Sequence, residues 1–433
     1  MTGMQRHRRD ASALAFSIAL AGACAGEGRE ETDGPGVITS ASGSASSLTG
    51  STGATPGTTS ASTAGDVGSE TSASTTGAGA TGTTLTGASS TSTGSTQTTE
   101  STQTTGAETA GQLDPCEGQG LEPIPASLLP LLDERVGFGE NAVGGKDGCL
   151  YRVTNLNDAG PGSLREGAER EQALWIVFDI DGDIALNSEI RVTSNKTIDG
   201  RGAYIRIYDD GLHILDETHD VIVHNLIFKE DTSGADSDDA IRLMNDAHDV
   251  WIHHVSFSAY PDGLLDITRR STDVTVSWCK FSQHNKVMLI GASPDHEFDD
   301  VIRVTLHHNW FRETTQRHPR LRYGKVHAFN NYYDSWGSYG AVSSTHGQLY
   351  SERNIYEAGD DKDAVLTIFG DDPASGDCSS VDDWALNGAS VDEHNPDDVF
   401  KPSGFYAYQA DEASATLRDA IESDAGWRDV PLP

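Results

Sequence analysis

A repeated segment of about nine residues in the middle of the chain limits the folds that are possible. Its closing aromatic residues follow one another at intervals of 29, 24, 30, 22 and 23 residues. The copies are DVIVHNLIF (220–228), DVWIHHVSF (249–257), DVTVSWCKF (273–281), RVTLHHNWF (303–311), KVHAFNNYY (325–333) and QLYSERNIY (348–356), with NKTIDGRGA (195–203) as a looser first copy. A period of this length is typical of repeat architectures.

Each copy predicts a short strand, a polar break and a second short strand that carries the aromatic residue. One coil of this size has no core of its own, but coils stacked about 4.8 Å apart share one. Asn309, Asn331 and Asn354 each stand two positions before the aromatic residue, which predicts a hydrogen-bonded ladder of side-chain amides. We therefore predict an all-β fold, a right-handed parallel β-helix, over roughly residues 176–356. A β-sandwich is less consistent, because Asn-Gly and Asp-Gly hairpin turns are largely missing between the strand patterns.

Composition divides the chain into three parts. Residues 1–24 have a basic start, a short apolar run and small residues, as in an export signal. Residues 25–113 are rich in Thr, Ser, Gly and Ala, and we predict that they form a disordered linker. Residues 114–433 form the predicted folded domain, which is long enough for a large core.

The sequence LAGAC around Cys24 resembles a bacterial lipoprotein signal. Two alternatives stay open: acylation of Cys24, which would tether the protein to the cell surface, or cleavage at a nearby A-x-A site and secretion. Either one takes the protein out of the cytosol, where disulfides can form. Cys116 and Cys149 flank the start of the folded domain and are candidates for a pair, while Cys279 lies in a strand pattern that predicts a buried thiol.

A basic segment stands out in a chain of formal net charge −36. Between Val301 and Lys325 there are six Lys or Arg residues and a single acid, Glu313. A solvated face or a nucleic-acid patch would explain such a segment alone. The acids and cations elsewhere in the repeat favour an acidic polysaccharide, with no nucleic acid and no obligate protein partner, and we expect a monomer.

Charged side chains suited to metal or substrate binding occur at comparable positions of four neighbouring coils. Carboxylates from two adjacent coils would form a hard-oxygen site suited to Ca²⁺, with cations from the next two coils beside it. Each residue alone would be read as an ordinary surface side chain, and only the set in this order is informative. The set comprises Asp236, Asp238 and Asp239 in ADSDDAI, Asp262 and Asp266 in DGLLD, Lys286 in HNKVMLIG, and Arg317 and Arg322 in RHPRLR.

With this set of motifs, the chain resembles the pectate lyases of polysaccharide lyase family 1. The resemblance covers about residues 136–356 and rests on GFGENAVGGKDGCLYRVTNLNDAGPGSLREG, SNKTIDGRGA, DVWIHHVSFS, DGLLDIT, HNKVMLIG and RHPRLRYGKVHAFNNYY, in family order. It implies a parallel β-helix closed at one end by a short helix. It also implies calcium-binding acids at Asp239, Asp262 and Asp266, uronate-binding cations at Lys286 and Arg322, and a catalytic base at Arg317.

Two positions depart from the family pattern. Some members have an acid where this chain has Ser237, so Asp236 or Asp238 would take its place and the number of calcium ions stays open. The family sequence W-I-D-H reads W-I-H-H here, with His253 in place of Asp, at a position that we expect to serve the turn beside the site.

The resemblance implies an exported enzyme that cleaves polygalacturonate by calcium-assisted β-elimination and releases unsaturated oligogalacturonates. Two alternatives remain: a pectin lyase, which acts on methyl-esterified polymer without calcium, and a non-catalytic polysaccharide-binding surface solenoid. The three acids argue against the first and Arg317 against the second. A polygalacturonase would need a G-H-G sequence, which this chain lacks. A helix is also expected at TLRDAIESDAG, packed over the solenoid.

Overall fold

The computed structural model describes residues 116–117, 120–230 and 239–433, which lie in the C-terminal unit of the chain, Thr109–Pro433. The predicted export signal, Cys24 and the whole of the predicted linker lie outside these residues, so the division into three parts stays a prediction. Within the described ranges, no helix is long and apolar enough to cross a membrane.

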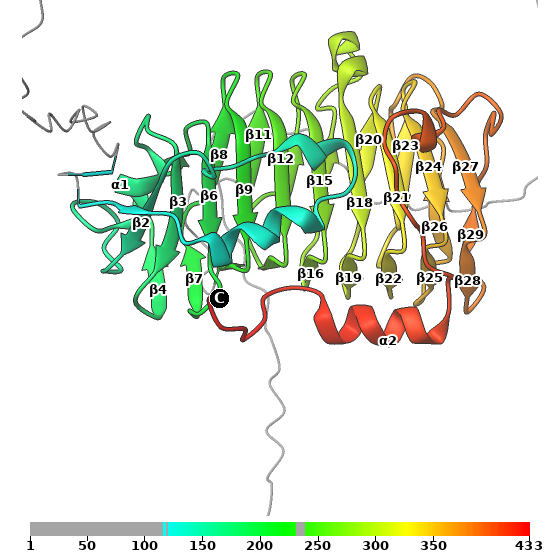
Figure 1. Ribbon diagram of the computed structural model, residues 1–433. Helices are drawn as coiled ribbons and strands as arrows, with labels where there is room; N and C mark the ends of the chain where they lie inside the picture. Colours follow the sequence, from blue (N-terminus) through cyan, green and yellow to red (C-terminus); the bar gives the residue numbers. More distant parts are fainter. Residues whose placement is uncertain (1–115, 118–119, 231–238) are drawn as a thin grey trace, which may run out of the picture. The chain divides into compact units, whose positions relative to one another are not determined.

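The described residues of the domain form three long sheets, whose strands are given below as far as the structure describes them (Figure 1). Sheet A has 11 strands: β1 (Glu122–Pro123), β2 (Cys149–Val153), β3 (Leu174–Phe178), β6 (Lys196–Asp199), β9 (His219–His224), β12 (His248–His253), β15 (Thr272–Ser277), β18 (Arg303–His307), β21 (Lys325–Phe329), β24 (Gln348–Glu352) and β27 (Asp377–Val381). Sheet B has nine: β4 (Gly182–Ala185), β7 (Ile205–Tyr208), β10 (Ile227–Lys229), β13 (Ser256–Ser258), β16 (Lys280–Ser282), β19 (Trp310–Arg312), β22 (Tyr332–Asp334), β25 (Ile355–Glu357) and β28 (Trp384–Leu386). Sheet C also has nine: β5 (Ile190–Arg191), β8 (Leu212–Leu215), β11 (Ile241–Met244), β14 (Leu265–Ile267), β17 (Leu289–Ile290), β20 (Arg320–Arg322), β23 (Ala341–Ser344), β26 (Asp363–Leu366) and β29 (Ser390–Val391).

The chain visits the sheets in the order A, B, C and then repeats. For example, β9 in sheet A leads to β10 in sheet B, to β11 in sheet C and back to β12 in sheet A. Neighbouring strands of each sheet are parallel, apart from the antiparallel pair β1–β2. The predicted parallel β-helix is confirmed. It runs from β2 to β29, beyond the predicted range at both ends. The predicted range was too short because the outer coils lack the closing aromatic residue that marks the repeat in the sequence.

The repeated residues stack in columns inside the solenoid. The closing aromatics pack face to face, with ring centroids 5.5, 4.9, 5.0, 4.9 and 4.6 Å apart from Phe228 to Tyr356. The predicted ladder is also present: Asn309 Nδ2 donates to Asn331 Oδ1 at 2.9 Å, and Asn331 Nδ2 donates to Asn354 Oδ1 at 3.0 Å. These amides are fully buried, so the ladder satisfies polar groups that would otherwise be costly inside the core.

Helical segments cover parts of the solenoid. Near the first coils lies α1 (Leu164–Ala168), which Ser163 caps by accepting a hydrogen bond from the Glu166 amide. The 3₁₀ helix η1 (Ala126–Glu134) packs apolar residues against sheet A, and η2 (Phe138–Asn141) follows it. Two further 3₁₀ helices are η3 (Glu297–Val301) and η4 (Pro402–Gly404).

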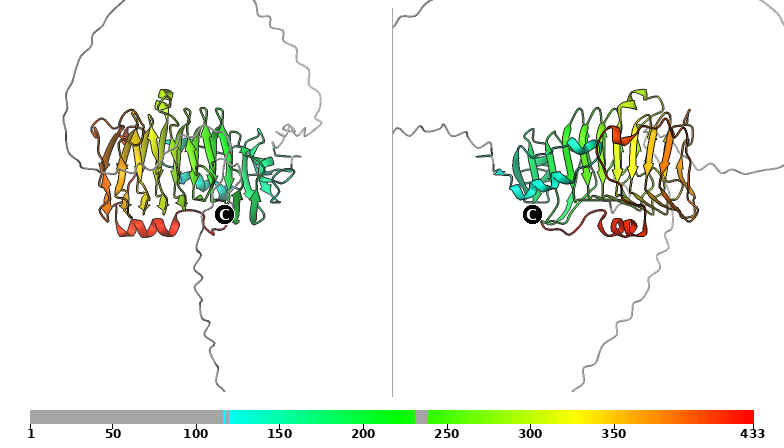
Figure 2. Two further views of the ribbon diagram at one scale, coloured as in Figure 1. Left: turned by 180° about the vertical axis from the view of Figure 1, so that it is seen from behind. Right: turned by 45° about the vertical axis from the view of Figure 1, so that its right-hand side comes forward.

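The expected C-terminal helix is present as α2 (Ala415–Asp424). Leu417 and Ile421 pack against Trp310, Tyr332 and Ile355 of sheet B. The helix therefore lies along one side of the solenoid, as Figures 1 and 2 show.

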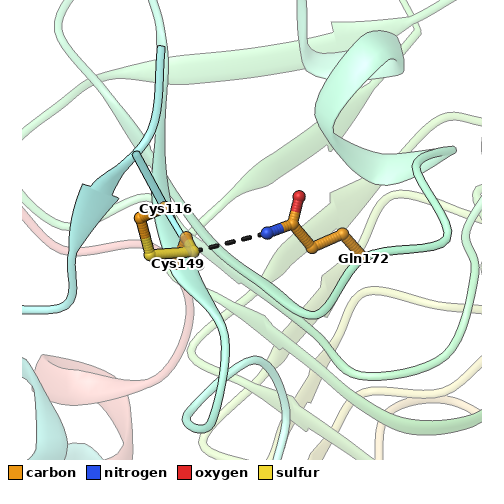
Figure 3. Close-up of a disulfide and its surroundings, with 3 residues drawn as sticks. All are labelled: Cys116, Cys149 and Gln172. Atoms are coloured by element: carbon orange, nitrogen blue, oxygen red, sulfur yellow. Dashed lines mark hydrogen bonds between the residues drawn. A yellow bond between two sulfur atoms is a disulfide. The ribbon is translucent and has the colours of Figure 1, made fainter. Parts of the chain in front are cut away.

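Cys116 and Cys149 form a disulfide with a sulfur–sulfur distance of 2.02 Å (Figure 3). The Gln172 side-chain amide lies 3.4 Å from Cys149 Sγ. Cys279 and Cys378 are buried thiols, so the expectation for Cys279 is confirmed.

Candidate active site

Most of the described candidate residues lie at or just after the point where the chain passes from sheet B into sheet C, whereas Arg322 is the last residue of β20 in sheet C. Four consecutive connections contribute, those that lead into β11, β14, β17 and β20, and these strands are neighbours in sheet C. Gly263, Lys286 and Gln316 pair directly from one coil to the next, which fixes the register of the last three connections. The sequence-based expectation that these residues lie on successive coils is therefore confirmed. Asp236 and Asp238 lie outside the described residues.

Two carboxylates converge over Gly263. A Cβ atom at this glycine would lie 2.5 Å from Asp239 Oδ1 and 2.8 Å from Asp266 Oδ1, so any larger residue would collide with both. The Gly263 amide donates to Asp239 Oδ1 at 2.7 Å, and Arg242 Nε donates to Asp239 Oδ2 at 2.9 Å. The Leu289 amide donates to Asp266 Oδ1 at 3.0 Å. Backbone donors therefore hold both acids in place.

The electrostatics of this pair favour a bound cation. Burial raises the pKa of Asp266 well above its usual range, and the negative charge of Asp239 raises it further. The positive charge of Arg317 and the Leu289 amide act in the opposite direction. Since two ionised carboxylates so close repel each other, a divalent ion with oxygen ligands would relieve the repulsion.

Asp262 points to a different partner. Its Oδ1 accepts a hydrogen bond from Lys286 Nζ at 3.1 Å, and both side chains are largely exposed, at 52% and 38%. Among the residues that the structure describes, no group of three or more His, Cys, Asp or Glu side chains is arranged to hold a metal ion. The structure thus brings together two of the three predicted calcium ligands, and the third lies beside a predicted substrate-binding cation.

Arg317 stands at a sharp turn before β20. Its backbone has a φ of 67°, and the peptide bond that follows, between His318 and Pro319, is cis. The backbone N–H and ring Nδ1 of His318 both contact the Gly340 carbonyl oxygen, at 3.0 and 2.8 Å. Burial lowers the pKa of His318 to about 3, so this imidazole is neutral and its Nδ1 donates to the carbonyl. His318 thereby anchors the turn that carries Arg317 beside the Asp266 carboxylate.

Arg322 is almost fully buried, with 2% of its surface exposed. Its Nε donates to Asp372 Oδ1 at 2.8 Å and its Nη1 donates to the Ala292 carbonyl at 2.9 Å. The sequence reasoning missed Asp372, which lies in no repeat and no recognised motif. The available signal was indirect: a strand that buries two arginines, Arg320 and Arg322, needs a counter-charge from elsewhere in the chain.

The expectation for His253 is wrong. His253 lies at the end of β12 in sheet A, before a turn that leads to sheet B, whereas the candidate site lies between sheets B and C. Its ring stacks on His224 at 5.0 Å, and its Nδ1 lies 2.9 Å from Ser277 Oγ. His253 therefore serves a turn that leads to sheet B and not the connection that carries the candidate residues.

Comparisons with known proteins agree with the fold. A family model described as pectate lyase matches residues 176–429. Pectate lyase 1 of Chamaecyparis obtusa is 40% identical over 258 residues, which cover 54% of this chain and 68% of the relative. A pectate lyase of Nicotiana tabacum is 37% identical over 252 residues, 53% of this chain and 64% of the relative.

Solved structures show the same fold. The crystal structure of Jun a 1, the major allergen from cedar pollen, has a TM-score of 0.62 and 31% sequence identity, and the match covers 69% of this chain and 94% of that one. A pectate lyase from Bacillus sp. N165, solved in complex with trigalacturonate, has a TM-score of 0.54 at 24% identity, with 68% and 98% covered. At that identity the second likeness speaks for the fold alone.

The fold and the matched region define a parallel β-helix enzyme of the polysaccharide lyase class. The chain belongs to the pectate lyase family, and its function is that of a polysaccharide lyase acting on pectate.

Proposed function

We propose that this enzyme cleaves de-esterified polygalacturonate by β-elimination and that Ca²⁺ assists the reaction. The observation that carries the proposal is the convergence of the Asp239 and Asp266 carboxylates over Gly263, with Arg317 close enough to influence the Asp266 carboxyl group. Hard carboxylate oxygens suit Ca²⁺, and two protein carboxylates leave coordination positions for substrate. Asp262 would become a third ligand if its side chain turned away from Lys286, with which it forms an exposed hydrogen bond.

The substrate explains why opposite charges lie together at this site. Each sugar of polygalacturonate carries a carboxylate, and the hydrogen on C5 is α to it. Removal of that proton adds negative charge to a group that is already anionic. A bound calcium ion would supply charge neutralisation at the uronate carboxylate. Lys286 and Arg322 would bind uronate carboxylates and orient the sugar, so that its C5 hydrogen faces Arg317.

The bond changes are those of an elimination. The C5–H bond breaks, its electron pair forms the C4=C5 double bond, and the C4–O4 bond breaks, after which O4 takes a proton from solvent. An arginine is not normally deprotonated in proteins, since its pKa exceeds about 12. Arg317 therefore has two possible roles: it accepts the proton itself, or it stabilises the dianion while hydroxide accepts the proton. Both roles require its guanidinium beside C5.

One assay separates this proposal from its alternatives. Polygalacturonate is incubated with the enzyme, and ultraviolet-absorbing unsaturated ends are measured with added Ca²⁺, with chelator, and with chelator followed by Ca²⁺ or Mg²⁺. We expect activity only with Ca²⁺, because Mg²⁺ demands a tighter octahedron and keeps its waters. Full activity in chelator, with a preference for methyl-esterified polymer, would identify a pectin lyase. Binding without unsaturated ends would identify a non-catalytic solenoid.

Direct measurement of metal binding tests the ligands independently of activity. Asp266→Asn should weaken Ca²⁺ binding in calorimetry, because it removes one of the two converging charges. Ser237→Asp provides the comparison, since it introduces an acid where some relatives have one. Unaltered Ca²⁺ affinity in Asp266→Asn would remove this residue from the ligand set.

The N-terminal features lead to a proposal about location. We propose that residues 1–24 direct export and that residues 25–113 link the domain to that end, with Cys24 as a candidate lipid attachment site. Cys24→Ser should release a lipid-anchored protein from membranes into the medium. If the variant stays membrane-bound, the anchor is not at Cys24. Sedimentation of the secreted domain should give a monomer.

A further inference from the structure

Arg320 and Arg322 are buried side by side on β20, and one carboxylate serves them both. The two arginines are 3% and 2% exposed, and Asp372 is 7% exposed. Arg322 Nε donates to Asp372 Oδ1 at 2.8 Å, while Arg320 Nη2 donates to Asp372 Oδ2 at 3.2 Å. Asp372 comes from the connection between β26 and β27, two coils further along the solenoid than β20.

Asp372 is itself held in place. Ser344 Oγ donates to Asp372 Oδ2 at 2.6 Å, and Ser344 is paired with Arg322 across β20 and β23. Burial alone would favour the neutral acid, but the Ser344 hydrogen bond and the charges of both arginines hold the pKa of Asp372 below its usual range. Nearby, Phe369 of the same connection lies 5.7 Å from the Arg320 guanidinium. The carboxylate is therefore ionised and fixed over the two arginines.

The consequence for Arg322 is a guanidinium fixed from two sides. Asp372 holds its Nε from one side, and the Ala292 carbonyl, which follows β17 of the preceding coil, holds its Nη1 at 2.9 Å. A guanidinium has five N–H donors in a rigid plane, so these two bonds set the plane and leave donors for another acceptor. The charges matter as well, because two cations and one anion keep a net positive charge of one at this place.

We propose that Asp372 is a positioning residue of the active site, which orients Arg322 for a substrate carboxylate. The inference rests on the proposed function, since it needs Arg322 to bind a uronate. Asp372 does not touch substrate in this proposal. It acts through Arg322, and the Ser344 hydroxyl keeps it aligned.

The test is a double-mutant cycle on polygalacturonate cleavage with Ca²⁺ present. Asp372→Asn keeps the shape of the side chain but removes its charge. We expect kcat/KM to fall by about 10- to 100-fold, as small misplacements of a binding group do, mainly through a higher KM. In the Arg322→Ala background, Asp372→Asn should cause little further loss, because the group that it positions is already missing. Ser344→Ala removes the hydrogen bond that aligns the same carboxylate but leaves both arginine contacts, so its KM should rise as well, by less than in Asp372→Asn.

A purely structural ion cluster gives a different result. Thermal unfolding would then shift in all variants, while the KM of the folded Asp372→Asn protein would stay at the wild-type value, and this outcome overturns the inference. Equal losses from Asp372→Asn in the wild-type and Arg322→Ala backgrounds overturn it too. If Asp372→Asn does not fold, Asp372→Glu retains the charge but displaces it by one methylene, and an unchanged KM there also contradicts the inference.

The cycle also distinguishes this inference from the proposed function. A wild-type enzyme that makes no unsaturated ends refutes the function. An Arg322→Ala variant with unchanged KM refutes the role of Arg322, and the inference with it. An altered Arg322→Ala beside an unaltered Asp372→Asn refutes the inference alone.

Discussion

Two turns of the solenoid use repetition in opposite ways. At the turn from sheet A to sheet B, successive coils repeat one residue type, as in the fully buried column Asn309, Asn331 and Asn354. At the connection from sheet B to sheet C, successive coils carry Asp262, Lys286 and Arg317. A repeated residue can satisfy its neighbours in the column, whereas a series of different charges leaves groups available for a ligand. Stability should therefore depend on the first turn and activity on the second.

The largest effect is expected at the second turn. Arg317→Ala should lower kcat by about three to five orders of magnitude, as for arginines that stabilise transition-state charge, with little change in thermal unfolding. The side chain keeps partial exposure, so no core packing is lost. Initial rates of unsaturated-product formation and the unfolding temperature are the two measurements. Normal turnover by Arg317→Ala would contradict the expectation that activity depends on the connection from sheet B to sheet C.

Arg317→Lys sharpens the result. Lysine keeps the charge but loses the planar fork of donors. Substantial remaining activity would indicate charge stabilisation, and almost none would indicate that the guanidinium geometry is essential. The rate should rise towards alkaline pH in the wild type, since a weakly acidic carbon-bound proton is removed.

The next prediction concerns the stability of the folded protein at acidic pH, which depends on histidines near the turn from sheet A to sheet B. Several buried histidines have lowered pKa values, because burial disfavours their charged forms. Neighbouring cationic or imidazole groups add to this at four of them near the ends of sheet A strands: His224, His253, His254 and His307. For His254 the folded pKa is about 2. In the unfolded chain each would titrate near pH 6.5.

Below about pH 6.5 the unfolded chain therefore binds more protons than the folded protein, and stability falls as the pH falls. Each neutral imidazole costs about 1.4 kcal/mol for one pH unit below that value, so these four together cost about 6 kcal/mol at pH 5.5. The contribution of Asp266 to stability has the opposite pH dependence. Because its pKa is higher in the folded protein than in the unfolded chain, this contribution is lost as the pH rises from the unfolded pKa towards the folded pKa. Denaturant unfolding between pH 5 and 8 measures the balance. A flat profile from pH 5.5 to 7.5 would show that the imidazoles are protonated in the fold.

A single step of the amide ladder should cost less. Asn331 Nδ2 donates to the Leu306 carbonyl and to Asn354 Oδ1, and its Oδ1 accepts from the Asn309 amide. Asn331→Ala leaves these buried partners unsatisfied and should lower the free energy of unfolding by about 3 kcal/mol. The kcat of the folded fraction should be unchanged, as determined by rates normalised to folded protein. A loss of kcat at full stability would mean that this ladder also serves the site.

The two turns also differ in how much of their structure could be predicted from the sequence. Repetition is visible in sequence, so the solenoid, the aromatic stack and the amide ladder were predictable from spacing. The convergence of Asp239 and Asp266 over Gly263 followed from placing both on adjacent coils, but the turn of Asp262 towards Lys286 did not, because side-chain direction depends on the local register. Asp372 was not predictable, since it reaches Arg322 across two coils from a connection with no repeat.

The smallest effect on stability is expected at Asp262, which tests the comparison at its weakest point. Its ion pair with Lys286 is exposed, and exposed pairs contribute roughly 0 to 1 kcal/mol, so Asp262→Asn should change the unfolding temperature very little. Activity should nevertheless suffer, because the variant frees Lys286 but removes a proposed calcium ligand. We expect a higher Ca²⁺ concentration for half-maximal rate, measured by calcium titration of activity. Asp273→Asn, which breaks the Arg303 ion pair on the sheet A side, is the matched control and should leave that concentration unchanged. If both variants shift the calcium dependence equally, the effect is one of general surface charge, and the division of labour between the two turns does not hold.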